Sequence, residues 1–161
     1  MSEKIYNFAA GPAVLPAAVL ETVQKEMFDW HGSGMSVMEM SHRGAEFLEI
    51  FSETKEKFKK ALAVPDSHEV LFMQGGATAQ FAAVPLNLMG KDGSADYAVT
   101  GNFSGIAAKE AAKYGGVHIA ASSADKNFSY IPRQEALALS EGASYFHYCA
   151  NNTIFGTAWN Y

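Results

Sequence analysis

Apolar residues at helical spacing mark a first helix near the start of the chain. Pro16 is suited to the first position of a helix, where its missing N–H costs nothing. The glycines of residues 32–34 are typical of a helix end. The apolar positions between these two signals form one stripe, and they are Val19, Leu20, Val23, Met27 and Trp30.

A second stripe predicts a second helix, with charged residues interspersed on what we interpret as its solvated face. We interpret both stripes as core-packing surfaces rather than cofactor contacts, since an amphipathic helix normally buries its apolar face. The second stripe consists of Phe47, Leu48, Phe51, Phe58 and Leu62.

From Glu69 onward, short apolar runs alternate with helical patterns. We predict strands at 70–73, 97–100, 117–121 and 145–149, and helices at 77–89, 104–114 and 135–139. This alternation is typical of an α/β fold with a mainly parallel sheet and flanking helices. We therefore divide the chain into an N-terminal arm with helices, 1–65, and a partial α/β domain, 66–161. Residues 151–153 are predicted to form a turn. The apolar residues 154–159 lead us to expect that the sheet continues in a longer protein.

Composition excludes several classes of protein. The chain has 161 residues, of which 48% are hydrophobic and 18% charged, so it can build a core. A net charge of −5 argues against a nucleic-acid binder, and no apolar run approaches the roughly 20 residues that span a membrane. The start of the chain lacks a signal-peptide pattern. The missing signal-peptide pattern and the single cysteine, Cys149, which has no partner for a disulfide within the chain, together predict a cytoplasmic protein.

The strand–Gly75-Gly76-Ala77-Thr78–helix passage has the form of a phosphate-binding turn. Two glycines let a backbone approach a ligand closely, and the following helix offers free N–H groups and the positive end of its dipole. The passage matches neither the Walker pattern nor the dinucleotide fingerprint. A plain tight turn between strand and helix explains the glycines equally well.

Other candidate groups lie in loops. In Ser41-His42-Arg43-Gly44, the Arg43 guanidinium can bind a carboxylate or phosphate at two points, although such a pair is more often structural. Phe103 and the turn 151–153 each follow a predicted strand, at the sheet edge where α/β proteins bind ligands. The five histidines lack metal-ligand spacing, so no metal is expected. Three loops at one edge predict a flat, phosphorylated ligand.

Four ordered motifs resemble phosphoserine aminotransferases. They are residues 7–12 (NFAAGP), 36–44 (SVMEMSHRG), 74–81 (QGGATAQF) and 147–154 (HYCANNTI). The similarity covers the whole chain but only the N-terminal, smaller part of that family's length. It implies part of the large domain of a fold-type I, class V aminotransferase. That homodimeric enzyme uses pyridoxal 5'-phosphate to move an amino group between glutamate and 3-phosphohydroxypyruvate in serine biosynthesis. Some members also serve the pyridoxine route.

The resemblance also implies roles for residues. Ala77 and Thr78 would hold the cofactor phosphate, Phe103 would stack on the ring, and Thr153 would bond its phenolic oxygen. Three residues would lie near the bound substrate, and we call them the substrate group: Arg43, His42 and Ala10. Arg43, with His42, would bind the acidic end of the substrate across the dimer interface. Phe103 stands where the family usually has Trp. Bacterial members often carry Arg at the position of Thr78.

The resemblance implies no catalytic residue within this chain. The family's cofactor-anchoring lysine and the aspartate that pairs with the pyridine nitrogen fall beyond residue 161. None of Lys91, Lys109, Lys113 and Lys126 stands in that lysine's motif. We therefore expect the 161 residues alone to be inactive. Two alternatives stay open, a non-catalytic anion-binding or interaction module and a relative of the cysteine desulfurases.

Overall fold

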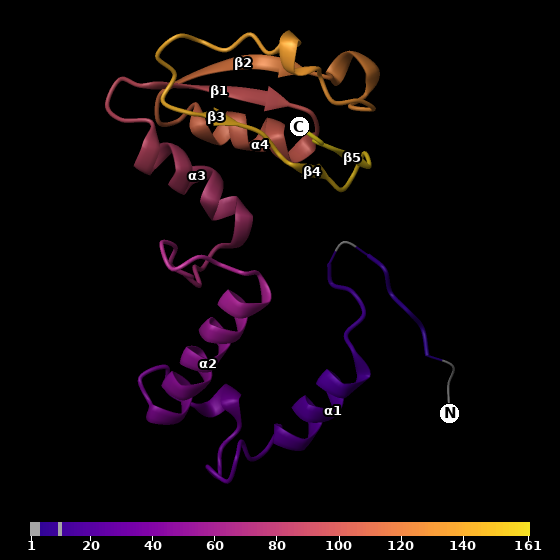
Figure 1. The fold of residues 1–161 in the computed structure, drawn as a ribbon, viewed down its shortest axis with the longest axis vertical. Coiled ribbons are helices and arrows are strands. Elements are labelled where there is room, and N and C mark those ends of the chain that lie inside the picture. The colour runs from indigo at the N-terminus through magenta and orange to yellow at the C-terminus, as the bar shows by residue number, and fades with distance from the viewer. Residues whose placement is uncertain (1–3, 10) are drawn as a thin grey trace. The chain divides into compact units, whose positions relative to one another are not determined.

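The computed structural model describes residues 4–9 and 11–161, and it divides into two compact units, Met1–Phe72 and Met73–Tyr161 (Figure 1). The first unit is helical and the second holds the sheet. Within the described part of the chain, no helix is long and apolar enough to cross a membrane.

In the first unit, helix α1 (Ala17–Glu26) begins directly after Pro16, as predicted, but ends before Trp30. The extension to Trp30 is wrong because His31, Gly32 and Gly34 adopt positive φ angles and turn the chain. Trp30 is buried in this turn, where its N–H donates to the carbonyl of Met35 at 3.0 Å. Trp30 is therefore buried, as an apolar residue of the stripe should be, but it lies in a turn and not in the helix.

The second helix, α2 (Ala45–Ala61), confirms the prediction from the apolar stripe, and a short 3-10 helix, η1 (Val37–Glu39), precedes it. Phe72 packs edge-on against Phe51 and Phe58, with ring centroids 5.5 and 6.2 Å apart. Even so, 40% of Phe51 and 44% of Phe58 is exposed. The interpretation of this stripe as a buried core surface is therefore wrong for this chain. The same holds for the first stripe on α1, where Val19, Leu20 and Val23 are 46–48% exposed.

Several charged residues of α2 form ion pairs. Lys55 forms an ion pair with Glu69, and Lys59 lies 3.9 Å from the same carboxylate. Lys57 pairs with Glu53 one turn earlier at 2.6 Å. The Lys57–Glu53 pair is mostly exposed and fits the predicted solvated face, whereas the side chains of Lys55 and Lys59 are only 29% and 26% exposed. Exposed pairs of this kind stabilise a helix by well under about 1 kcal/mol each.

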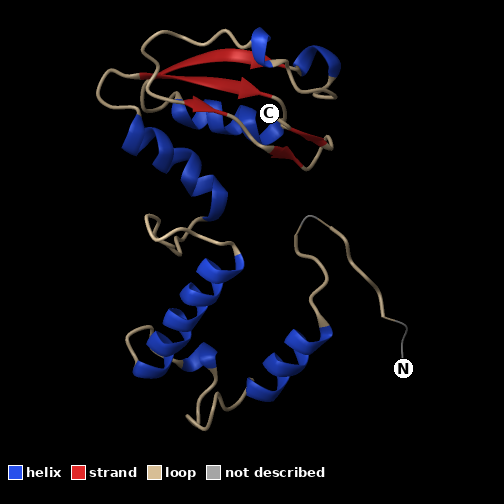
Figure 2. Cartoon of the chain, in the orientation of Figure 1, coloured by secondary structure: helices blue, strands red, loops and turns tan. Residues whose placement is uncertain are grey.

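The second unit is built on a three-stranded parallel sheet in the order β2-β1-β3, which confirms the predicted α/β class (Figure 2). The central strand β1 (Ser94–Val99) pairs with β2 (Gly116–Ser122) and β3 (Phe146–His147). Helix α4 (Asn102–Ala111) connects β1 to β2 and lies along one face of the sheet (Figure 1). Helix α3 (Gly76–Leu88) precedes β1 and contains Pro85.

Small residues let α4 approach the sheet closely. Ala107, Ala108 and Ala111 are buried against Tyr97 and Ala95 of β1, with Met89 completing the cluster. Tyr97 and Tyr145 share a hydrogen bond of 2.7 Å between their hydroxyls. The large side chain of Tyr97 thus packs against a helix face that carries only methyl groups.

Three predicted elements differ in the structure. Residues 70–73 form no strand, because none of the described strands pairs with them, and a strand needs such a partner. The helix predicted at 135–139 is a single 3-10 turn, η3 (Gln134–Ala136). The strand predicted at 145–149 shortens to β3, the length that pairs with β1.

The predicted turn at 151–153 is also corrected. Asn151 and Asn152 form strand β4 (Asn151–Asn152), which pairs antiparallel with β5 (Thr157–Ala158). The turn therefore begins two residues later than predicted, at Thr153, and it is closed by a hydrogen bond of 2.8 Å from the Gly156 N–H to the Asn152 carbonyl.

Candidate functional site

The carboxyl end of β1 leads directly into the first turn of α4. The hydroxyl of Ser104 accepts hydrogen bonds from the backbone N–H groups of Thr100, at 2.9 Å, and Gly101, at 3.0 Å. The same hydroxyl donates to the Gly101 carbonyl at 3.0 Å. One buried serine thereby fixes the turn that presents Phe103, the residue directly before it in the chain.

Phe103 lies in the first turn of α4, and 44% of it is exposed. Part of its ring is therefore open to solvent next to the carboxyl end of a parallel strand, the edge where α/β proteins bind ligands.

The start of α3 confirms a tight glycine turn. Gly75 and Gly76 both have positive φ angles, 86° and 58°. A Cβ at Gly75 would lie 2.4 Å from the Cβ of Ala79, whereas one at Gly76 would meet nothing within 4 Å. Gly75 is thus required by both conformation and space.

The next residues, Ala77 and Thr78, occupy the first turn of α3 with exposed side chains. Backbone N–H groups in the first turn of a helix have no partner within that helix. The Thr78 hydroxyl adds a further donor on the same turn. This end of the helix can therefore accept an anion, as the sequence predicted, although the geometry suits a plain turn as well.

Thr153 is exposed in the turn between β4 and β5. Its neighbour Asn152 is buried, with 4% of its surface exposed, and donates a side-chain hydrogen bond to the carbonyl of Thr100. The Asn152 side chain also lies against Gly101, because a Cβ on that glycine would be 2.4 Å from Nδ2. The structure thus brings the segments that carry Thr153 and Phe103 together.

Two buried hydroxyls lie at this same edge of the sheet. Thr100 Oγ1 follows β1 and Ser123 Oγ follows β2, and neither has a hydrogen-bond partner among the described residues. Buried polar groups are normally paired. The carboxyl edge therefore keeps unused capacity for hydrogen bonding, as a site for a polar ligand would.

The predicted substrate group belongs to the first unit. Arg43 and His42 are exposed in the turn before α2, which is closed by a bond of 2.9 Å from the Gly44 N–H to the Ser41 carbonyl. Ala10 lies outside the described residues. The four candidate cofactor residues, Ala77, Thr78, Phe103 and Thr153, all belong to the second unit.

A polar cluster around the buried Asp96 joins β1, β2 and the loop after η3, and no motif in the sequence predicts it. Asp96, 1% exposed, accepts hydrogen bonds from His118 Nδ1 at 3.0 Å, from the Ser140 N–H at 2.6 Å and from the Ser140 hydroxyl at 2.8 Å. Ser140 Oγ lies 3.1 Å from that same His118 nitrogen. A catalytic triad needs serine and aspartate on opposite ring nitrogens. This cluster is therefore a structural clamp.

Two titratable groups at and just after β3 are shifted toward their neutral forms. Burial lowers the pKa of His147, whose ring stacks on Tyr97 with centroids 4.8 Å apart. Burial also raises the pKa of the half-buried Cys149, so its thiol is a poor nucleophile at neutral pH. Within residues 4–9 and 11–161, no three acidic, histidine or cysteine side chains gather to hold a metal ion.

Comparison with known proteins matches residues 5–161 to the family model described as aminotransferase class-V. A phosphoserine aminotransferase of Nitrosomonas europaea is 54% identical over 158 residues, which are 98% of this chain and 43% of that relative. The chain thus spans less than half the length of the curated relatives that it matches.

Solved structures give the same result. Phosphoserine aminotransferase from Bacillus circulans subsp. alkalophilus superposes with a TM-score of 0.91 at 42% identity, over 99% of this chain and 44% of that one. The pyridoxal-phosphate-bound phosphoserine aminotransferase from Trichomonas vaginalis does so with a TM-score of 0.88 at 39% identity, over 98% of this chain and 44% of that one. At 42% and 39% identity, the similarity to these structures indicates the same protein family and not only the same fold.

Proposed function

Because the chain belongs to the class-V aminotransferase family, we propose that it forms the N-terminal part of a phosphoserine aminotransferase. The complete enzyme would transfer an amino group from L-glutamate to 3-phosphohydroxypyruvate, giving phosphoserine and 2-oxoglutarate in serine biosynthesis. Use of a related phosphorylated oxo acid of the pyridoxine route belongs to the same proposal. The observation that carries the proposal is the 54% identity to a phosphoserine aminotransferase along 98% of the chain.

The residues of the second unit fit pyridoxal 5'-phosphate. We assign its phosphate to the open first turn of α3, with the Ala77 backbone and the Thr78 hydroxyl as donors. The exposed ring of Phe103 would stack on the pyridine ring, and the Thr153 hydroxyl would donate to the phenolic oxygen. A helix N-terminus suits a phosphate because its dipole and its free N–H groups act together.

The chemistry itself comes from the cofactor, which serves as an electron sink when it is bound. The residues of this chain bind and orient it. In the first unit, Arg43 with His42 would bind an acidic end of the substrate, and Ala10 would contribute through its backbone. An arginine fork suits both the carboxylates of glutamate and the phosphate of the oxo acid. In the proposed homodimer this arginine reaches the site of the partner subunit.

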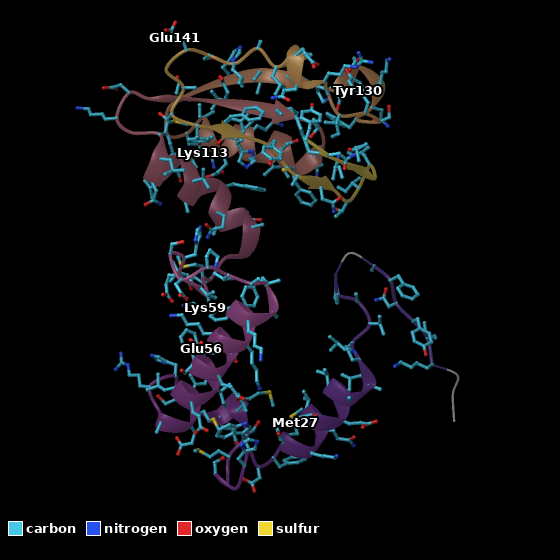
Figure 3. All side chains as sticks on the ribbon, viewed as in Figure 1. Met27, Glu56, Lys59, Lys113, Tyr130 and Glu141 are labelled. Carbon is cyan, nitrogen blue, oxygen red and sulfur yellow. The ribbon has the colours of Figure 1, made fainter. Side chains whose placement is uncertain are left out.

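We expect none of the lysines of this chain to supply the missing anchor. Lys113 pairs with Glu110 at 2.5 Å at the end of α4, and that hydrogen bond raises the pKa of its ammonium group (Figure 3). A fully charged, paired lysine is a poor nucleophile. The family's anchoring lysine lies in a motif that this chain does not contain, so we expect the 161 residues alone to show no transamination.

The division of the protein near residue 65 remains a prediction, as does its cytoplasmic location. A cytoplasmic location is supported by the one free cysteine, Cys149, because proteins of a reducing compartment rarely depend on disulfides. The enzyme is proposed to need small-molecule substrates and a second copy of itself, without a nucleic acid or membrane partner.

The test is a coupled assay of the complete enzyme, loaded with pyridoxal phosphate, on glutamate with 3-phosphohydroxypyruvate. Phosphoserine and 2-oxoglutarate should form in equal amounts, and the 161-residue chain alone should form neither. An enzyme that binds phosphate but never the cofactor would instead support the anion-binding module. Turnover by the 161-residue chain would mean that one of its own lysines anchors the cofactor.

A further inference from the structure

We propose that Asn152 is a positioning residue of the cofactor site: its buried amide ties the turn that carries Thr153 to the turn that carries Phe103. The inference rests on the proposed function, because it concerns how two proposed cofactor contacts are held in register. Asn152 itself would touch neither cofactor nor substrate.

The first observation is that Asn152 contacts both segments that meet here, the turn from β1 into α4 and the β4–β5 hairpin. We call this meeting point the junction. Its side-chain amide donates to the carbonyl of Thr100, the last residue before the turn into α4, and lies 3.4 Å from Thr157 Oγ1 on strand β5. Its own carbonyl accepts the Gly156 N–H at 2.8 Å, which closes the turn that begins with Thr153. One residue therefore fixes the hairpin internally and attaches it to β1.

The second observation explains Gly101. The φ angle of this glycine is 172°, an extended value that any residue adopts, so backbone conformation does not require glycine there. Space does, since a Cβ would lie 2.4 Å from Nδ2, 2.6 Å from Oδ1 and 2.7 Å from Cγ of Asn152. The glycine leaves room for one side chain, and that side chain is the amide of Asn152.

The third observation is that this junction is rigid on the helix side. Ser104 holds the backbone of Thr100 and Gly101 through hydrogen bonds of 2.9 and 3.0 Å, and Phe103 precedes Ser104 in the same helical turn. A shift of the Asn152 amide would therefore move Thr153 relative to Phe103, because the other side of the junction cannot follow. Misplacing a binding group by about 1 Å is enough to weaken a site strongly.

The central test is Asn152→Asp in the complete enzyme. The substitution keeps the size of the side chain but replaces the donor that faces the Thr100 carbonyl with an acceptor. We expect the dissociation constant for pyridoxal 5'-phosphate, titrated into apoenzyme, to rise roughly 10-fold, the effect of one lost hydrogen bond. The circular dichroism of the bound cofactor should change as well, because the ring is no longer held between fixed contacts.

The matched control is Asn151→Asp, which makes the same chemical change one residue away on an exposed side chain. It should leave both the dissociation constant and the dichroism unchanged. A second variant, Gly101→Ala, displaces the amide from the other side and should weaken cofactor binding in the same direction. Combined with Asn152→Ala, it should add little, because the alanine at 152 removes the atoms with which the new methyl group collides.

The possible results distinguish a failure of the proposed function from a failure of the positioning role of Asn152. If the wild-type enzyme fails to bind pyridoxal phosphate, the proposed function fails and this inference fails with it. If the wild type binds it, but Asn152→Asp lowers only the melting temperature and leaves affinity and dichroism intact, the proposed function stands and the positioning role is refuted. Should Asn152→Asp fail to fold, wild-type cofactor affinity and dichroism in Gly101→Ala refute the role in the same way.

Discussion

Replacing Asp96 with asparagine should destabilise the second unit markedly, because its carboxylate clamps three segments of the chain. Asp96 of β1 accepts one hydrogen bond from His118 of β2 and two from Ser140 in the loop after η3. Asparagine has nearly the same shape but only one acceptor oxygen. Its NH2 group must therefore face at least one of the donors that the carboxylate now binds.

The magnitude follows from the burial of the group. A hydrogen bond to a charged acceptor contributes about 1.5–3 kcal/mol. The donors add no large desolvation penalty, because the His118 side chain is 49% exposed and Ser140 is half-buried, so a donor left unpaired can bond water. We expect Asp96→Asn to lower the free energy of unfolding by about 1.5–3 kcal/mol. For a protein of this size that corresponds to a drop in melting temperature of roughly 3–12 °C.

The effect should also depend on pH with a defined sign. Burial alone raises the pKa of Asp96, but the hydrogen bonds from Ser140 and His118 outweigh burial and hold it below its ordinary value. A lowered pKa means that the carboxylate stabilises the fold fully above about pH 4, the usual value of a free aspartate, and loses this contribution as pH falls through the folded value. The difference between wild type and variant should therefore shrink in acid.

Thermal and urea unfolding followed by circular dichroism, at pH 7 and at steps down to pH 3, measure both expectations. The control is Asp92→Asn, the same change at an exposed carboxylate in the loop before β1, which should shift stability by less than about 0.5 kcal/mol. The reasoning is refuted if Asp96→Asn matches this control at pH 7, or if the gap between wild type and variant stays constant down to pH 3.

Three further predictions concern the proposed site. In the complete enzyme, Arg43→Lys should raise the Michaelis constants for both acidic substrates while cofactor absorbance stays unchanged, since lysine cannot bind an anion bidentately; unaltered kinetics would assign the arginine to structure. Thr78→Ala should weaken pyridoxal phosphate binding roughly 10- to 100-fold by removing one charge-assisted bond, and an equal dissociation constant in titration would contradict its role. Gly75→Ala, at φ 86° and 2.4 Å from the Ala79 Cβ, should cost well over the roughly 1 kcal/mol expected for Gly76→Ala, which meets no atom; equal melting temperatures would argue against the steric reason.

Much of the local structure could be predicted from the sequence, because it depends on neighbours along the chain. The periodic apolar residues of α2 and the glycine turn before α3 are set by side chains three or four positions apart. Alternation of short strands with helices was enough for the parallel α/β class. The four ordered motifs indicated the family for the same reason, since a motif is itself a local pattern.

Tertiary structure decided what depends on partners distant in the chain. Residues 70–73 have the composition of a strand, but strand formation requires a pairing backbone, and none of the described strands provides one. From the sequence, Asn152 is predicted to be a turn residue. In the structure, β4 pairs with β5, and the Asn152 side chain is buried against Gly101, which lies 51 positions earlier (152 − 101). The Asp96 clamp joins residues 22 and 44 positions apart. Such contacts arise only when folding brings strand ends together, so no spacing along the sequence could reveal them.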